Sequence, residues 1–424
     1  MDSTPNPDPG FDPHFDSGAT PGHRFHASAL WRALPAGMRR RWWMFRPLDL
    51  IARSFPVLKK RRGVLVIRMD GIGDMVLFRG CLDHYAEALG VEKEDITVLG
   101  CESWRDVADE IFAGYRVIAI NEHAFARRPL YRFRVSMMVR ALAPRVVVND
   151  SYLRRAMMAD SLALASGATE TISSLPYINE PTRSEYLYYL SQATRIVNTG
   201  DYPTHETVRH YRFVSALAGR EIPPRPPRIS WRDTVPERVG AGPYVVLCPG
   251  SNEPGRRWPF EQYLDMARRL LVAGYRVVFV GTRDEKNNQD PTAELSNNPG
   301  VVNLIGKTSM PEVLDLMNHA AGVLSNDSGP AHVAIALGTP TLVVVGGGHF
   351  GCFFPYPEGV KPDNAHFAFE RMDCYHCFWR CPKRATKHDV FPCISAVGAD
   401  QVWAQLERML PPVAGKTNAG APAQ

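Results

Sequence analysis

The 424-residue sequence has no long hydrophobic run. Its most apolar stretches, such as residues 64–67 and 341–345, have the length of strands, whereas a membrane span needs roughly 18 to 20 apolar residues. Residues 1–18 are acidic and proline-rich, without the apolar segment of a secretory signal. We therefore expect a cytoplasmic protein.

Cysteine and unbalanced charge are also scarce. Eight cysteines are too few for a disulfide scaffold in a chain of this length, so clustered ones are interpreted as metal ligands or free thiols. The 49 Lys+Arg and 44 Asp+Glu leave a net charge of +5, too even for a protein that coats nucleic acid, and no nucleic-acid partner is expected. With 45% hydrophobic and 22% charged residues, the composition excludes a mostly disordered or fibrous protein.

Composition divides the chain into two folded regions with extensions. Residues 1–60 are predicted to be a disordered and basic extension, because residues 1–28 have little apolar content. Residues 30–62 mix arginine and lysine with tryptophan, phenylalanine and leucine, so they could bind an anionic membrane surface or pack as an arm on the adjacent domain. The other predicted regions are a domain over 61–222, a proline-rich linker over 223–242, a second domain over 243–411 and a disordered tail over 412–424.

Strand-like and helix-like segments alternate in both regions. This pattern is typical of a parallel sheet covered by helices on both faces, so the sequence predicts the α/β class with a doubly wound domain in each half. The predicted strands are 64–68, 96–99, 116–120 and 145–148 in the first half, and 244–248, 276–280, 301–305, 323–325 and 341–345 in the second. The predicted helices include 205–218, 259–271, 311–319 and 329–337.

A first motif runs from Arg68 to Asp74, directly after the first predicted strand. Open α/β sheets bind ligands at this edge, and Gly71 and Gly73 permit a tight turn and a close approach. In the first helical turn, Asp74 could take a proton from a hydroxyl nucleophile. The alternative is that Asp70 and Asp74 only stabilise the helix N-terminus.

A second motif, Cys-Pro-Gly-Ser-Asn-Glu-Pro-Gly-Arg-Arg-Trp-Pro over 248–259, joins a strand to a helix. Glycines, the Ser251 hydroxyl and the Arg256 guanidinium before a helix N-terminus suit a diphosphate. An ordinary loop with surface arginines is the alternative.

A third motif, Leu-Ser-Asn-Asp-Ser-Gly-Pro-Ala-His, ends at His332. Asp327 ends a strand, and Ser328 and Gly329 expose backbone N–H groups at a helix start. This arrangement could hold a phosphate and a sugar hydroxyl, or it could consist of a capping Asp327 and a hydrogen-bonded core His332.

Together these residues resemble glycosyltransferase family 9, the ADP-heptose:lipopolysaccharide heptosyltransferases and their relatives. The matching pieces are the Asp-x-x-Gly-Asp turn, the Pro-Gly-Ser loop with a basic residue before x-Trp-Pro, the Leu-Ile-Gly-Lys-Thr-Ser-Met segment over 304–310, and the third motif. They occur in the family's order and cover about residues 62–346. The resemblance implies a GT-B fold, in which two Rossmann-like domains face each other across a cleft with the acceptor on the first and the nucleotide sugar on the second.

The resemblance also implies roles for individual residues. Asp74 would be the general base of an inverting, metal-independent displacement, and Asp70, Gly71 and Gly73 would line the acceptor side. Arg256 stands where relatives usually carry a phosphate-binding lysine. The implied donor-binding residues are Ser251, Arg256, Glu285, Thr308, Asp327, Ser328, Gly329 and His332.

Two features depart from the family pattern. Relatives commonly have Phe-Gly-Pro-Thr after the last strand, whereas this chain has three glycines and His349, so a heptose donor is not secured. The basic N-terminal extension is the other departure.

A cysteine cluster lies within residues 370–395. Cys374, Cys377, Cys381 and Cys393 have the spacing of thiolate ligands, which suggests a structural zinc or iron, although a disulfide, free thiols or a redox role are alternatives.

The leading hypothesis is an enzyme that moves a sugar from a nucleotide-diphosphate donor such as ADP-heptose to a hydroxyl of a cell-envelope glycan or glycolipid. Heptose is one candidate for this sugar. It would work at the cytoplasmic face of the inner membrane and need no catalytic cofactor. The alternatives are transfer to a protein, or a catalytically silent GT-B protein that binds a nucleotide sugar.

Overall fold

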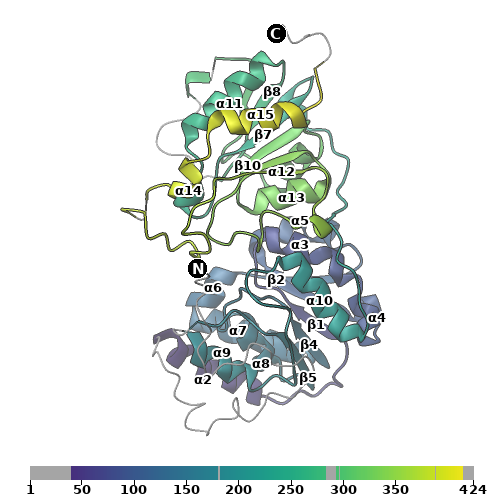
Figure 1. Ribbon diagram of the computed structural model, residues 1–424. Helices are drawn as coiled ribbons and strands as arrows, with labels where there is room; N and C mark the ends of the chain where they lie inside the picture. Colours follow the sequence, from purple (N-terminus) through teal and green to yellow (C-terminus); the bar gives the residue numbers. More distant parts are fainter. Residues whose placement is uncertain (1–39, 180–181, 283–292, 296, 387, 414–424) are drawn as a thin grey trace. The chain divides into compact units, whose positions relative to one another are not determined.

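The computed structural model describes residues 40–179, 182–282, 293–295, 297–386 and 388–413 (Figure 1). The chain forms two compact units. The first consists of Met1–Gly71 and Cys81–Pro224, and the second of Ile72–Gly80 and Arg225–Gln424. Most of helix α3 (Ile72–Leu82) therefore belongs with the second unit.

The first unit contains a parallel six-stranded sheet in the order β3-β2-β1-β4-β5-β6. This order is that of the Rossmann fold. Figure 1 shows helices on both faces, with α7 and α8 on one side of the sheet and α4 and α10 on the other. The strands are β1 Val64–Ile67, β2 Ile96–Cys101, β3 Arg116–Ile120, β4 Val146–Asn149, β5 Glu170–Ser174 and β6 Arg195–Val197. The helices include α4 Tyr85–Leu89, α5 Arg105–Ile111, α6 Glu122–Arg127, α7 Pro129–Leu142, α8 Ala159–Ser166, α9 Arg183–Leu190 and α10 Glu206–Ala218.

Helix α2 (Arg40–Ser54) precedes this sheet and packs against α7 and α8. Phe45, Asp49 and Ala52 are buried on its inner face, and the Asp49 carboxylate accepts two hydrogen bonds from Arg132, at 2.9 and 2.7 Å. This helix lies within the predicted disordered extension 1–60, so residues 40–54 form a packed arm rather than a disordered segment. Residues 1–39 lie outside the described residues.

The second unit repeats the architecture. Its sheet has the order β12-β11-β10-β7-β8-β9, again with every strand parallel to its neighbours. Helices α11 and α15 pack together, as do α12 and α13 (Figure 1). The strands are β7 Tyr244–Cys248, β8 Arg276–Phe279, β9 Val301–Asn303, β10 Gly322–Asn326, β11 Thr341–Val344 and β12 Ala365–Ala368. The helices include α11 Phe260–Val272, α12 Met310–Asn318, α13 Gly329–Leu337, α14 Pro392–Ser395 and α15 Ala399–Met409.

The predicted α/β class with two doubly wound, Rossmann-like sheets is confirmed. All nine predicted strands are present, with shifts of one or two residues at half of their ends. The sequence analysis missed β5, β6 and β12, because these strands are short and two of them begin with charged residues. Among the described residues, no helix is long and apolar enough to cross a membrane.

Candidate active site

The turn between β1 and α3 carries the first motif. Gly71 is the N-cap of α3 and, as a glycine, has no side chain that could cap the helix. Asp74 lies in the first turn of α3. The Asp70 carboxylate accepts a hydrogen bond from Ser151 at 2.7 Å and pairs with Arg68 at 3.1 Å. The Asp70 carboxylate is therefore bound by residues at the ends of β1 and β4 of the first unit. Asp74 lies on the part of α3 that belongs to the second unit.

A buried ionic network lies behind Asp70 in the first unit. The Asp150 carboxylate accepts hydrogen bonds from Arg68 at 2.5 Å and Tyr85 at 3.0 Å, and lies 2.9 Å from Nδ1 of His210. Although burial raises the pKa of Asp150, Arg68 and His210 hold it well below its usual range. Burial lowers the pKa of His210 and favours its neutral form, with Asp150 opposing this shift.

The same network includes three groups of the metal-ligating type. The ligand atoms of Cys81, Asp150 and His210 lie within 4.8 Å of one another, and all three residues are buried. However, the guanidinium of Arg68 already neutralises the carboxylate, and a second cation beside it would be repelled. This cluster fits an ionic network that supports the first strand better than it fits a metal site.

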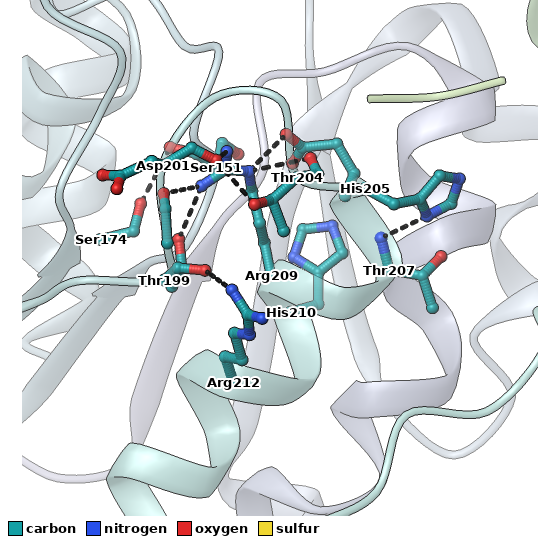
Figure 2. A network of polar contacts seen from close by, with 12 residues as sticks. Ser151, Ser174, Thr199, Asp201, Thr204, His205, Thr207, Arg209, His210 and Arg212 are labelled. Atoms are coloured by element: carbon teal, nitrogen blue, oxygen red, sulfur yellow. Dashed lines mark hydrogen bonds and ion pairs between the residues drawn. The ribbon is translucent and has the colours of Figure 1, made fainter. Parts of the chain in front are cut away.

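The segment after β6 is built around two arginines of α10 (Figure 2). Arg209 donates to the carbonyl oxygens of Gly200, Asp201 and Thr204, and Arg212 donates to that of Thr199. His205 caps the helix by accepting a hydrogen bond from the Thr207 backbone N–H at 3.3 Å. The Arg209 guanidinium also lies 3.4 Å from the centre of the Tyr152 ring. These contacts fix the carboxyl edge of the first sheet.

The loop of residues 249–258, here called the donor loop, connects β7 to α11. Asn326 at the end of β10 donates to the Pro249 carbonyl at 2.7 Å and accepts from the Trp258 backbone N–H at 3.0 Å. Arg257 donates twice to the carbonyl of Ser251, whose side chain is buried. Arg257 and Asn326 are structural members of the site that the sequence analysis did not single out.

Arg256 is the cation that the donor loop presents. It interacts electrostatically with Asp327, Glu253 and Asp74. Burial lowers its pKa, and these three carboxylates oppose the change. Its Nε atom is buried and has no hydrogen-bond partner among the described residues. The guanidinium thus lies among carboxylates with a donor unused, as expected of a group that can bind an anion.

The turn from β10 into α13 carries the third motif. Ser328, rather than Asp327, is the N-cap of α13 and makes no side-chain capping bond, so the capping interpretation of Asp327 is wrong. Asp327 is buried, and burial raises its pKa to about 6 although Arg256 opposes the rise. Gly329 begins the helix with its backbone against Ile72 and Gly73 of α3, and a Cβ there would lie 3.0 Å from Cγ2 of Ile72.

His332 is held by aromatic residues. Its Nδ1 lies 2.8 Å from the hydroxyl of Tyr356, and its ring stacks on Phe354 with centroids 3.9 Å apart. A Cβ on Gly73 would lie 2.8 Å from the imidazole Cδ2, so the glycine is required for close contact between α3 and α13. His332 is therefore a hydrogen-bonded, buried histidine beside the helix that carries Asp74. Tyr356 and Phe354 gave no sequence signal because they lie in an irregular segment.

The remaining predicted donor residues lie apart from this group in sequence. The Thr308 hydroxyl is buried and has no hydrogen-bond partner in the part of the chain that the structure describes. Thr308 precedes the Ser309–Glu312 capping box of α12. Glu285 lies outside the described residues, so its predicted role stays a prediction.

All eight cysteines lie in the described residues, and none of them forms a disulfide there. Cys374, Cys377 and Cys381 are half-buried and Cys393 is buried. Burial raises the pKa of Cys377 and of Cys393, and the neighbouring thiols of the cluster raise both further. The four sulfurs thus interact, although among the described residues no three of them form a ligand group within 4.8 Å like that of Cys81, Asp150 and His210.

Comparison with known proteins gives a family match and several similar proteins. Residues 194–361 match the model of glycosyltransferase family 9 (heptosyltransferase). The match covers less than half of the chain. Lipooligosaccharide heptosyltransferase 2 of Haemophilus influenzae is 34% identical over 112 residues, which are 26% of this chain and 32% of that protein. This chain thus spans about a third of the length of that curated relative.

Two solved structures are similar in fold. The ADP-heptose lipopolysaccharide heptosyltransferase II of Escherichia coli has a TM-score of 0.57 and 18% identity, with 82% of this chain and 98% of that chain covered. The iron-containing dodecameric glycosyltransferase TibC of enterotoxigenic E. coli has a TM-score of 0.51 and 16% identity, with 82% and 76% covered. The family resemblance inferred from the four motifs is confirmed, and so is the predicted pair of Rossmann-like domains of the GT-B type.

Proposed function

We propose that this chain is a glycosyltransferase that moves a sugar from a nucleotide-diphosphate donor such as ADP-heptose to a hydroxyl of a lipopolysaccharide-type glycan. The observation that carries the proposal is the grouping of Arg256, Asp327 and Asp74 within one unit, where the arginine interacts with both carboxylates. The family match over 194–361 supports a nucleotide-sugar donor, and so does the similar fold of the E. coli ADP-heptose lipopolysaccharide heptosyltransferase II.

The reaction follows from the charges of these groups. Asp74 takes the proton of the acceptor hydroxyl as its oxygen attacks the anomeric carbon, and the bond from that carbon to the diphosphate oxygen breaks. The electron pair and the negative charge leave with the nucleoside diphosphate. Arg256 and the backbone N–H groups of Ser328 and Gly329 at the start of α13 stabilise that charge. Attack from the face opposite the diphosphate inverts the anomeric configuration.

Asp327 has a separate task in this proposal. Because burial raises its pKa to about 6, it holds its carboxylate form at a cost near neutral pH and gains from a hydrogen-bond donor. A sugar hydroxyl is such a donor. Asp327 would therefore orient the transferred sugar, while Ser251 and Thr308 border the diphosphate and the nucleoside.

The four cysteines of residues 370–395 form the part of the proposal that concerns a metal. Their electrostatic coupling and soft sulfur donors fit a structural zinc or iron ion, and TibC is described as iron-containing. An ion would require the thiols to draw closer together and would order the segment rather than take part in the sugar transfer.

We also propose that the chain contacts the inner membrane through the region around α2. Leu50, Ile51 and Phe55 are exposed on or just after this helix, and Leu58 is 97% exposed beside Lys59 and Lys60. Apolar groups next to cations suit an anionic lipid surface. Replacing Ile51 and Leu58 by glutamate should abolish co-sedimentation with anionic vesicles while transfer to a soluble acceptor continues. Unchanged co-sedimentation would reject the membrane contact.

A donor screen tests the proposed function. The purified chain is titrated with ADP, UDP and GDP sugars, and stabilisation against heat and release of the nucleoside diphosphate are measured. An adenosine donor that stabilises the protein and yields ADP only with acceptor supports the transferase. Binding without turnover on glycan or protein acceptors would support a silent binding protein, and absence of any binding would reject the proposal.

A further inference from the structure

The Cys-rich segment does not stand apart from the donor loop. The Phe391 backbone N–H donates to the Gly255 carbonyl at 2.8 Å, and Arg384 forms an ion pair with Glu253 at 2.8 Å. Gly255 has no space for a side chain, since a Cβ there would lie 2.4 Å from Nη1 of Arg384 and 2.7 Å from the Phe391 ring. The donor loop is therefore fixed on one side by residues of this segment.

Trp379 makes the contact that concerns the anion-binding cation. The guanidinium carbon of Arg256 lies 4.1 Å from the centre of the indole ring, within the range of a cation–π interaction. Trp379 also packs against Phe391, with ring centroids 5.3 Å apart. The ring thus contacts Arg256 and also packs against the core of the second unit.

The three glycines after β11 are matched to this tryptophan. A Cβ on Gly346 would lie 2.8 Å from the indole of Trp379, one on Gly348 would lie 2.1 Å from it, and one on Gly347 would lie 2.3 Å from the Tyr375 ring. The His376 and Phe378 backbone N–H groups donate to the carbonyls of Gly347 and Gly348. The departure from the family's Phe-Gly-Pro-Thr therefore makes room for the Cys-rich segment.

The backbone around Trp379 is held in an unfavourable conformation. His376, Phe378 and Trp379 have φ angles of 68°, 52° and 60°, in the left-handed region that residues with a Cβ seldom adopt. Such strain persists where the surrounding contacts determine it, and it clusters at functional sites. Here it turns the indole toward Arg256.

We propose that Trp379 is a positioning residue of the donor site: its ring holds the Arg256 guanidinium in place to bind the diphosphate of the donor. This inference rests on the proposed function, since it takes Arg256 as a diphosphate ligand. A planar guanidinium stacks on an aromatic face, whereas a lysine ammonium keeps more of its water. Arginine in the place of the family's usual lysine is thus matched to the tryptophan.

A double-mutant cycle with ADP as the probe tests this inference. Affinities are measured by calorimetry for the full chain and for Trp379→Leu, Arg256→Gln and the double variant. We expect Trp379→Leu to weaken ADP binding about tenfold. In the Arg256→Gln background the same substitution should weaken binding little further. The affinity of Trp379→Phe should lie between those of the unaltered protein and Trp379→Leu. Trp403→Leu is the matched control, because Trp403 on α15 forms a cation–π pair with Arg269 on α11. This substitution should leave the ADP affinity unchanged.

The outcomes separate the inference from the proposed function. If Arg256→Gln loses affinity but Trp379→Leu does not, or if Trp379→Leu weakens ADP binding equally in both backgrounds, the positioning role is overturned and the transferase stands. If the unaltered protein binds neither ADP nor a nucleotide sugar, the proposed function itself fails. Should Trp379→Leu not fold, Trp379→Phe and Trp379→His complete the cycle.

Discussion

Asp74 is the residue on which the proposed chemistry depends. Asp74→Asn should keep donor binding and lower kcat on the order of 10²-fold or more, because the amide cannot accept the hydroxyl proton. The measurement is the steady-state rate with saturating donor. Asp106→Asn is the matched control, since Asp106 is an exposed acid in the first turn of α5. A near-normal rate for Asp74→Asn would remove the general base from the proposal.

Asp327 allows a prediction about pH and stability. Its carboxyl has a pKa of about 6 in the folded chain, against about 3.9 in an unfolded chain, so the ionised form destabilises the fold above pH 6 and the effect vanishes below about pH 4. At pH 7.5, Asp327→Asn should therefore raise the free energy of unfolding by an amount on the order of 2–3 kcal/mol. This change is measured as an increase in Tm. The gain should shrink as pH falls from 6 to 4.

The same variant should bind the nucleotide sugar more weakly. A gain in stability that is equal at pH 5 and pH 7.5, or an unchanged donor affinity, would contradict the role of Asp327 as a costly buried carboxylate kept for binding.

Sequence reasoning located the residues that carry charge but not those that hold them. Asp74, Arg256 and Asp327 stood in turns after strands, where their types and positions indicate a ligand site. Asn326, Tyr356 and Trp379 gave no such signal, because their partners are 24 or more positions away in the chain. The sequence alone could not pair Arg256 with Trp379.

Helix α2 is the element that differs most from expectation. Its basic and aromatic composition resembles that of an interfacial segment, but its inner face buries Asp49 against Arg132. A buried carboxylate with a bidentate arginine partner can be recognised only once both elements are placed. The composition of residues 30–62 left the two alternatives open for this reason.

Breaking this ion pair should be costly. Asp49→Ala leaves Arg132 buried and unpaired, and we expect a loss of about 3–5 kcal/mol in unfolding free energy, measured by urea denaturation. As a control, Glu87→Ala removes the exposed pair with Arg220 and should cost less than about 1 kcal/mol. Equal effects of the two substitutions would show that α2 does not stabilise the first unit.

The Cys-rich segment has little regular secondary structure: among its described residues, the short helix α14 is the only helix. We expect about one equivalent of zinc or iron by elemental analysis of the purified protein. Chelation should expose residues 370–395 to protease and weaken donor binding, as Trp379→Leu does, without abolishing it, because the ion orders the segment that carries Trp379 and takes no part in the transfer. Metal-free protein with all four thiols alkylated in the native state would reject the site.

At the scale of the whole molecule, two sheets share one strand order. In each unit the first strand lies at the centre beside the fourth, which is the arrangement that opens a ligand crevice at the carboxyl edge. The alternation of hydrophobic strands and amphipathic helices made this architecture predictable. The assignment of α3 to the second unit was not predictable, because it depends on the glycines that bring Gly73 against His332 and Gly329.

The most direct test of the account is the transfer reaction itself. The full chain is incubated with ADP-heptose and a lipopolysaccharide core acceptor that lacks heptose, and the acceptor mass is measured together with the ADP released. The account predicts a mass gain of one heptose for each ADP, with neither product from Asp74→Asn at the same protein concentration. Unchanged acceptor mass across the nucleotide-sugar donors that bind, or equal transfer by Asp74→Asn, would contradict it.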